Sequence, residues 1–304
     1  MSPKGQKEVG MAKIVVVGSI NTDLVFTSDI RPKAGETVLG NTYSVIPGGK
    51  GANQAVAAAK LGAETYMVGC VGNDSNGDFS LKNLQQMNVN TQGVEVANHV
   101  PTGVANIVVA ENDNSIIVIS GANFEVSKEI VNKHRELIKT AEIVLLQLEI
   151  PLDVVEYTLE LCKENKVKVI LNPAPGMVLS NSMIENATYI TPNEHELKII
   201  FGQPIDQVLK NYPNKLIVTI GSKGAKYYDG NEIKIIPSYE VELVDTTGAG
   251  DTFCGGLAAA LVRGDSLEEA IKFANKAASM TVTKLGAQSG MPSLEELMKE
   301  YSSR

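Results

Sequence analysis

Short apolar runs rich in β-branched residues alternate with helical patterns along most of the chain, and this alternation constrains the fold more than any other feature. Four runs are mostly apolar: 14–17, 143–146, 167–171 and 216–220. Runs of this kind are typical of strands buried on both faces. Helical patterns lie at 52–61, 152–162, 251–262 and from Leu267 onward. The alternation predicts a three-layer α/β/α domain with a mostly parallel central sheet.

Two stretches break this alternation. Residues 24–47 show strand-like segments without a helical pattern, and residues 102–120 form a predicted hairpin around a polar turn at 111–114. We expect the two stretches to form a small separate β-sheet that closes over the mouth of the α/β domain as a lid. The large domain then comprises the segments 12–23, 48–101 and 121–304. Residues 1–11 are expected to be an extension or tag outside the fold.

Composition excludes several classes of function. The chain has 27 Lys and Arg against 35 Asp and Glu, a formal net charge of −8, which argues against nucleic-acid binding. No apolar run approaches the roughly 18 residues that a membrane span needs. Three widely spaced cysteines without a CxxC motif predict a reducing, cytoplasmic setting and no disulfide framework. The acidic balance also conflicts, at first sight, with a polyphosphate ligand.

The segment 245–256 carries the strongest chemical signal. Gly248, Ala249 and Gly250 are small, and a predicted helix follows them. Their backbone N–H groups and the helix N-terminus favour an anion, such as a phosphoryl group in transfer. Asp251 is placed to accept a proton from a substrate hydroxyl as general base. An alternative is that Asp251 only caps the helix.

A second signal lies at 47–53 and 19–23. Glycines allow close backbone approach to a ligand, and Asn53 offers donors and an acceptor for a hydroxyl-rich one. Asn21 and Asp23 follow the first strand, where ligands of open α/β sheets bind. For these two residues the alternative is ordinary turn chemistry.

Together the two glycine segments resemble the paired signatures of the ribokinase-like carbohydrate kinase family: Gly-Gly-Lys-Gly-Ala-Asn at 48–53 and Asp-Thr-Thr-Gly-Ala-Gly-Asp at 245–251. The second pattern is highly specific to that superfamily. The resemblance extends from about residue 12 to residue 300. Supporting segments follow in the family's order: Ser-Ile-Asn-Thr-Asp at 19–23, Gly-Glu-Thr-Val at 35–38, Gln-Leu-Glu at 147–149, Leu-Asn-Pro-Ala-Pro at 171–175, Thr-Pro-Asn-Glu at 191–194 and Thr-Ile-Gly-Ser-Lys-Gly at 219–224.

The resemblance implies a sugar site and a catalytic centre. Asp251 is then the base that deprotonates the sugar's 5-hydroxyl, with Gly248, Ala249 and Gly250 as the anion hole. Lys50 is expected to act through its backbone between the glycines, and for Glu149 an exposed strand-end carboxylate is the alternative. The implied substrate-binding residues are Asn21, Asp23, Gly49, Lys50, Gly51, Asn53, Glu149 and Asp251.

The resemblance also implies nucleotide and Mg²⁺ sites. Glu196 is expected to hold Mg²⁺ through water, which suits the reluctance of Mg²⁺ to lose its hydration. On spacing alone, Asn193 and Glu196 form a capping box instead, and Asn275 is a polar helix position. The implied nucleotide-binding residues are Asn193, Thr219, Gly221, Ser222, Lys223, Gly224, Gly250 and Asn275.

A monovalent-cation site, expected to hold K⁺, is implied beside the anion hole, mostly through backbone carbonyls. Its matching positions are Asp245, Thr247, Thr281, Lys284, Gly286 and Gly290. Gly290 departs from the serine often found there, with Ser289 beside it.

The resemblance therefore implies a cytoplasmic enzyme that phosphorylates D-ribose at O5 with ATP and Mg²⁺, and that forms a homodimer through the lid. Partners other than ribose, ATP and a second copy, such as nucleic acid or a membrane, are not expected. Other sugar or nucleoside kinases of the family, such as a deoxyribokinase or a fructokinase-like enzyme, and a non-catalytic sugar-binding regulator remain alternatives. The conflict over charge is resolved because backbone N–H groups and a helix end hold phosphate without adding to net charge.

Overall fold

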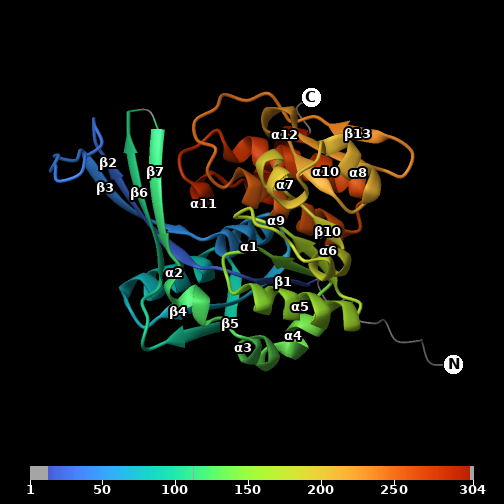
Figure 1. Ribbon diagram of the computed structural model, residues 1–304, viewed down its shortest axis with the longest axis horizontal. Coiled ribbons are helices and arrows are strands. Elements are labelled where there is room, and N and C mark those ends of the chain that lie inside the picture. The colour runs from blue at the N-terminus through green and yellow to red at the C-terminus, as the bar shows by residue number, and fades with distance from the viewer. Residues whose placement is uncertain (1–12, 112, 302–304) are drawn as a thin grey trace.

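A computed structural model describes residues 13–111 and 113–301. The expected extension at 1–11 lies outside the described residues. Figure 1 shows an α/β body with a narrower sheet, formed by β2, β3, β6 and β7, standing to one side of it. None of the described helices is long and apolar enough to span a bilayer.

The central sheet has six strands in the order β10-β9-β8-β1-β4-β5, and every pairing in it is parallel. This arrangement confirms the predicted fold class. Of its six strands, the pattern identified β1, β8 and β9 and missed β4, β5 and β10, and it also missed helix α2 between β4 and β5. The strands are β1 Lys13–Val17, β4 Glu64–Gly72, β5 Val89–Ala97, β8 Ile143–Leu146, β9 Lys168–Leu171 and β10 Tyr189–Ile190.

Both faces of this sheet are buried, which explains the continuous apolar runs. Within β1, Ile14 and Val16 join one hydrophobic core, while Val15 and Val17 join the other. The first core also takes residues from α1 Lys50–Lys60, α9 Ala249–Arg263, α10 Leu267–Thr281 and α12 Leu294–Tyr301. The second core takes residues from α3 Lys128–Lys133, α4 Arg135–Lys139, α5 Leu152–Glu164, α6 Asn181–Asn186, α7 Glu194–Phe201 and α8 Ile205–Asn211. The remaining helices of the body are α2 Ser75–Gln86, which adds Leu84 to the first core, and the short elements η1 Gly121–Glu125, η2 Gly221–Lys223 and α11 Ala287–Gly290.

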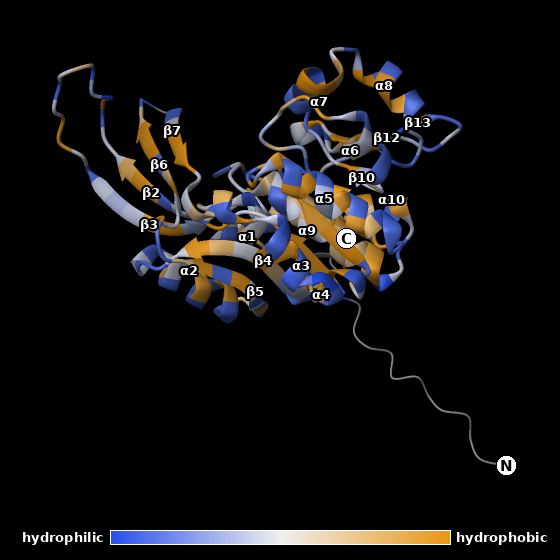
Figure 2. Ribbon diagram, turned by 60° about the horizontal axis from the view of Figure 1, so that its bottom comes forward, coloured by the Kyte–Doolittle hydropathy of each residue, from blue (hydrophilic) through white to orange (hydrophobic). Residues whose placement is uncertain are grey.

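The two stretches predicted to form a separate sheet do pair with each other. The four-stranded sheet has the order β3-β2-β6-β7 and consists of β2 Asn21–Thr27, β3 Thr42–Gly48, β6 Gly103–Ala110 and β7 Asp113–Ile119. Asn21, the first residue of β2, pairs with Gly48 at the end of β3 and with Gly103 at the start of β6. Figure 2 shows hydrophobic residues along β6 and β7, which stand clear of the α/β body.

The fourth apolar run, 216–220, does not extend the parallel sheet by a full ladder. Its strand β11 Ile217–Thr219 belongs to a three-stranded sheet and pairs antiparallel with β12 Ala225–Tyr228, which pairs with β13 Ile233–Ile236. Only isolated bridges join this run to the chain around β10, because β10 is two residues long.

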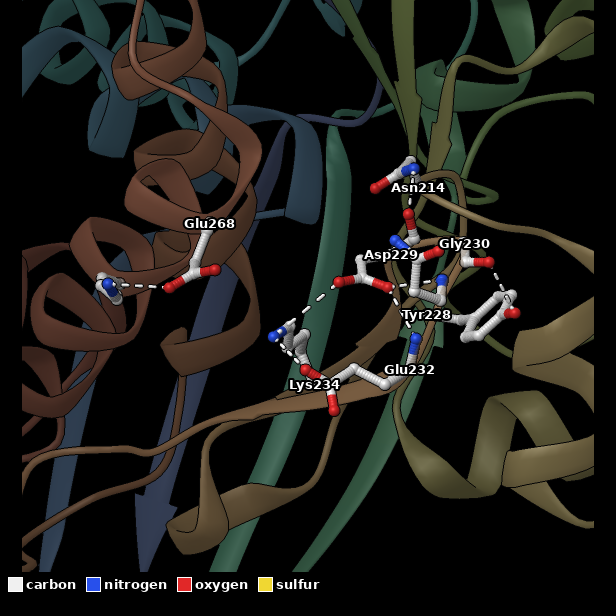
Figure 3. Close-up of polar contacts among 9 residues, drawn as sticks. Asn214, Tyr228, Asp229, Gly230, Glu232, Lys234 and Glu268 are labelled. Atoms are coloured by element: carbon white, nitrogen blue, oxygen red, sulfur yellow. Dashed lines mark hydrogen bonds and ion pairs between the residues drawn. The ribbon is translucent and has the colours of Figure 1, made fainter.

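The turn between β12 and β13 is held by side chains and lies apart from the cavity described below. Asp229 Oδ1 accepts from the backbone N–H groups of Asn231 and Glu232, at 2.7 and 2.8 Å. Figure 3 shows Lys234 between Asp229 and Glu232, with Glu268 of α10 on the other side. These contacts stabilise the turn, and none of the residues that make them lines the cavity.

Candidate active site

The N-terminus of α9 is built by a glycine with left-handed backbone. Gly248 is the N-cap, at φ 78°, and a Cβ there would lie 2.7 Å from the Ala287 Cβ. No side chain caps this helix, so the alternative that Asp251 is merely its cap is wrong. The Ala249 N–H donates to the Thr246 carbonyl at 3.2 Å, whereas the Gly250 N–H that follows has no capping side chain and is left for a ligand, as anion binding requires.

Asp251 is 7% exposed and held by two amide side chains from α1. Its Oδ2 accepts from Asn53 Nδ2 at 3.0 Å, and its Oδ1 accepts from Gln54 Nε2 at 3.1 Å. Burial raises the pKa of Asp251, while the Lys50 charge and the two amide donors act against that rise. A buried carboxylate with a raised pKa is suited to accept a proton during a reaction.

Lys50 contributes more than the backbone contact that the sequence suggested. Its N–H donates to Glu149 Oε2 at 3.0 Å, as a backbone role requires. Its side chain also lines the cavity, where burial lowers its pKa and the charges of Asp251, Glu149 and Glu196 outweigh that effect and raise it. The ammonium therefore stays charged among three carboxylates, where it can attract an anionic group.

A cavity of about 1200 Å³ extends from Lys50 and Asp251 to the loops around η2. It collects most of the predicted phosphate and nucleotide residues, although Lys223 is not part of its lining. A cavity of this size accommodates a nucleotide-sized ligand. The predicted residues that line it are Lys50, Asn193, Glu196, Thr219, Gly221, Ser222, Gly224, Gly248, Ala249, Gly250, Asp251 and Asn275.

The predicted sugar residues gather beside Asp251, at the base of the four-stranded sheet. Ser19 Oγ donates to Glu149 Oε2 at 2.6 Å, so Glu149 is bonded into the site and is not a free strand-end carboxylate. Gly51 packs so closely on Ser19 that a Cβ would lie 2.6 Å from the Ser19 nitrogen. Burial, with the charges of Glu149 and Asp251, raises the pKa of Asp23 to about 6.

Asn21 is oriented by Asn123, a residue that the sequence did not single out. Asn123 Oδ1 accepts from the Ile20 N–H at 2.8 Å, and its Nδ2 donates to Asn21 Oδ1 at 2.6 Å. Since a backbone N–H can only donate, both amides are fixed and the Asn21 NH₂ group is left to donate elsewhere. Gly49, at φ 86°, lies directly behind Asn21, where a Cβ would be 2.7 Å from its nitrogen.

Asn193 and Glu196 form the capping box that their spacing allowed. Asn193 Oδ1 accepts from the Glu196 N–H, and Glu196 Oε2 accepts from the Asn193 N–H, both at 2.8 Å. Burial raises the pKa of Glu196. Because only Oε2 is used in the box, the capping and the cavity-facing interpretations are compatible. Asn275 likewise lines the cavity while its Nδ2 donates to the Ile236 and Pro237 carbonyls, at 2.8 and 3.2 Å.

The residues predicted for a monovalent cation come together on two loops joined by Asp245. Asp245 Oδ1 accepts from the Thr247 N–H and hydroxyl at 2.9 and 2.7 Å, and Oδ2 accepts from the Gly286 N–H at 2.9 Å. Gly290 packs against Thr281, where a Cβ would lie 2.5 Å from the Thr281 carbonyl oxygen. Lys284 instead points toward Glu296, with 3.8 Å between Nζ and Oε1. The described residues contain no cluster of three or more His, Cys, Asp or Glu side chains that suits a metal.

Comparison with known proteins decides the family. The model of the pfkB family of carbohydrate kinases matches residues 11–294. The chain belongs to this family. A ribokinase of Bacillus subtilis is 49% identical over 288 residues, 94% of this chain and 98% of its own length. A deoxyribokinase of Salmonella typhi is 38% identical over 302 residues, 95% of this chain and 98% of its own. The structure of Arabidopsis thaliana ribokinase complexed with ribose and ATP superimposes with a TM-score of 0.87 at 34% identity, covering 95% of this chain and 98% of that one.

These matches confirm the resemblance and the fold that the sequence predicted. This pfkB kinase has the ribokinase-like α/β fold and is a sugar kinase that transfers a phosphoryl group. Both glycine segments lie within the residues that the family model matches, and Asp251 stands at the junction between the cavity and the predicted sugar-side residues.

Proposed function

We propose that this kinase phosphorylates D-ribose at O5 with ATP, in the cytoplasm. One observation carries the proposal: the buried Asp251 carboxylate stands between an anion-binding helix N-terminus and a cluster of polar residues suited to a polyol. Relatives named ribokinase and a related structure holding ribose and ATP support it. Cys70, Cys162 and Cys254 are all free and buried, which suits a reducing compartment.

In the proposed reaction, Asp251 accepts the proton of the 5-hydroxyl as the sugar oxygen attacks the γ-phosphorus in line, and the bond from that phosphorus to the bridging oxygen breaks so that ADP leaves. Main-chain N–H groups of Gly248, Ala249 and Gly250 stabilise the charge that develops on the transferring group, the Ala249 N–H in place of its 3.2 Å bond to the Thr246 carbonyl. Lys50 adds a positive charge on the same side of the cavity. Asn21, Asp23 and Glu149 orient the sugar, and the four-stranded sheet acts as a lid that excludes water.

A divalent cation fits the cavity beside Glu196. Glu196 Oε2 is bonded to the Asn193 N–H, which leaves Oε1 to contact the hydration shell of Mg²⁺. When bound with ATP, Mg²⁺ neutralises charge on the phosphates. We also propose that K⁺ binds between the loops of Asp245 and Gly286, largely through main-chain carbonyls. Hydrogen bonds from Thr247 and Gly286 lower the pKa of Asp245 although burial raises it, so this side chain remains anionic beside such a cation.

The lid offers a surface for a second copy of the chain. β7 is an edge strand on which Ile116, Ile117, Val118 and Ile119 are each more than half exposed. An edge strand with consecutive exposed aliphatic side chains favours pairing with another strand. We propose that two copies associate through this sheet as a homodimer.

A deoxyribokinase is the second candidate, because a relative of that name covers nearly the whole chain. The two activities differ in whether the enzyme requires the sugar's 2-hydroxyl. An ADP-release assay with ribose, 2-deoxyribose, fructose and adenosine, with and without K⁺, separates them. We expect the highest kcat/KM with ribose, and a higher value with 2-deoxyribose would replace the first proposal by the second. No ATP consumption with any of these substrates, in the presence of Mg²⁺ and K⁺, would favour a non-catalytic regulator.

The base assignment has its own test. Asp251→Asn keeps the size of the side chain and removes the proton acceptor. We expect kcat to fall by about 10² to 10⁴ while ribose still binds. Calorimetric titration with ribose measures binding, and the same ADP-release assay measures turnover. Turnover close to that of the parent enzyme would exclude Asp251 as the base.

A further inference from the structure

The residues that directly follow three neighbouring strands form a line of polar groups at one edge of the central sheet. Thr191 follows β10, Asn172 follows β9 and Gln147 follows β8. Gln54 of α1 bonds to both Asn172 and Gln147. We call the Thr191 carbonyl and the side chains of Asn172, Gln54 and Gln147 the amide row. All four residues are buried, and Gln54 and Gln147 are fully so.

The hydrogen bonds of the amide row have one direction, because its first member can only accept. The Thr191 carbonyl accepts from Asn172 Nδ2 at 2.9 Å, which leaves Asn172 Oδ1 to accept from Gln54 Nε2 at 3.1 Å. Gln54 Oε1 then accepts from Gln147 Nε2 at 2.6 Å. The orientation of the Gln54 amide is therefore fixed from both sides.

The Gln54 amide uses both of its hydrogens. One is donated to Asn172, and the other to Asp251 Oδ1 at 3.1 Å. The second carboxylate oxygen accepts from Asn53, whose own oxygen accepts from Gln288 Nε2 at 2.9 Å. Each oxygen of Asp251 thus has one donor whose orientation a further residue sets, and each keeps a lone pair for a substrate hydroxyl.

The far end of the amide row is not optimised for stability. Gln147 Oε1 is buried and has no hydrogen-bond partner among the described residues. Gly18, which follows the next strand β1, leaves the space that Gln147 occupies, since a Cβ there would lie 2.0 Å from Gln147 Oε1. A buried amide oxygen without a partner destabilises a fold, so the row calls for an explanation other than stability.

We propose that Gln54 is a positioning residue: the amide row holds its N–H group on Asp251 Oδ1 and fixes the plane of the carboxylate that takes the sugar's proton. This inference rests on the proposed function, in which Asp251 is the base. Gln54 is fully buried and does not line the cavity, so it acts through Asp251 and not on the substrates. Fixing a catalytic group in its reactive geometry is a recognised contribution to rate.

Donation from Gln54 also favours the ionised carboxylate. Burial raises the pKa of Asp251, and the Lys50 charge, Asn53 and Gln54 lower it. The other titratable groups around it are the carboxylates of Asp23, Glu149 and Glu196, and Cys254 of α9, whose thiol stays neutral because burial raises its pKa to about 12. Removing the Gln54 donor therefore moves the acid limb of the pH profile to higher pH.

The test compares Gln54→Met and Gln54→Glu with the parent enzyme. Gln54→Met keeps the volume and removes the donor. We expect kcat to fall about tenfold to a hundredfold, the loss of a hydrogen bond to a charged group, with the acid limb at higher pH. KM for ribose and ATP should stay within about twofold, because Gln54 touches neither substrate. Gln54→Glu keeps the shape and the contact with Gln147 but sets a second carboxylate against Asp251, so kcat at neutral pH should fall further.

Thr158→Val is the matched control. Thr158 is also fully buried, and its hydroxyl bonds the Val154 carbonyl within α5, away from the site. It should lower Tm and leave kcat and the acid limb unchanged.

A parent-like kcat and pH profile in Gln54→Glu, or a loss of kcat that only follows the loss of Tm, would overturn the positioning role of Gln54. Gln54→Glu decides the question if Gln54→Met does not fold. If Asp251→Asn is inactive and Gln54→Met behaves like the parent enzyme, only the positioning role of Gln54 is wrong. If Asp251→Asn is active, the assignment of Asp251 as the base, on which that role rests, is wrong.

Discussion

We expect Asp23, one of the residues proposed to bind the sugar, to lower the stability of the fold at neutral pH. Its pKa lies at about 6 in the fold, against 3.8 for the unperturbed group, because burial and the charges of Glu149 and Asp251 disfavour its ionised form. Below pH 3.8 both the folded and unfolded states hold the proton, and Asp23 does not affect stability. As pH rises toward 6 the unfolded state loses its proton first, so the free energy of unfolding falls.

The magnitude follows from the two pKa values. At about 1.4 kcal/mol for each pKa unit, the loss amounts to about 3 kcal/mol at pH 8 and about half of that at pH 5. Asp23→Asn removes the charge and with it this loss. We expect the variant to be more stable than the parent by about 1 to 3 kcal/mol at pH 8, since the buried amide recovers only part of the difference.

Urea unfolding of parent and variant at pH 5 and pH 8 measures this effect, with Asp29→Asn, an exposed aspartate near the same sheet, as control. Titration with ribose should show affinity reduced about tenfold or more, because a charge-assisted hydrogen bond to the sugar is lost. An Asp23→Asn variant no more stable than its parent at pH 8, or a stability difference equal at both pH values, would refute this account of Asp23.

Three further predictions follow from the geometry. Gly51→Ala should lower stability by about 1 to 3 kcal/mol in thermal melts, because its Cβ would meet the backbone of Ser19. Gly250→Ala should keep the parent Tm, because its Cβ meets nothing within 4 Å, but its kcat should fall because the methyl group blocks the proposed anion hole. Asp245→Ala should raise the K⁺ concentration needed for half-maximal activity. It should also lower stability by about 1 to 3 kcal/mol, since three donors lose their acceptor. An unchanged K⁺ requirement would show that Asp245 takes no part in binding the cation. Ile117→Lys places a charge on the proposed dimer surface and should give monomers in analytical ultracentrifugation, whereas Ile235→Lys, at another exposed isoleucine on β13, should not.

The features that sequence predicts here are those with a local physical cause. The run 143–146 coincides with β8 because both of its faces are buried, and the hairpin at 102–120 appears as β6 and β7 because a polar turn separates two alternating strands. The glycine segments are recognisable because they depend on main-chain conformation that few other residues adopt, as Gly248 shows.

The parts that sequence missed are set by contacts between distant segments. Asn53 and Gln54 meet Asp251 across nearly two hundred positions, and Asn123 reaches Asn21 across about one hundred. Hydrophobic periodicity does not predict which amide side chains contact one another in the fold. The only sequence signal for Gln54 is that it follows Asn53 directly. The run 216–220 was misplaced because a strand's partners depend on the length of its neighbour β10, which the run itself does not contain.

Strand β2 couples the orientation of the four-stranded sheet to the residues at its inner end. Only three residues separate it from β1, and its first three residues include both Asn21 and Asp23. The outer end of the sheet lies far from the α/β body, whereas the two side chains proposed to bind the sugar stand at its inner end. Any tilt of the sheet rotates Asn21 and Asp23 with it, so sugar affinity and the angle of the sheet cannot be tuned separately. Engineering a new sugar preference at these positions should therefore also change how fast the product leaves.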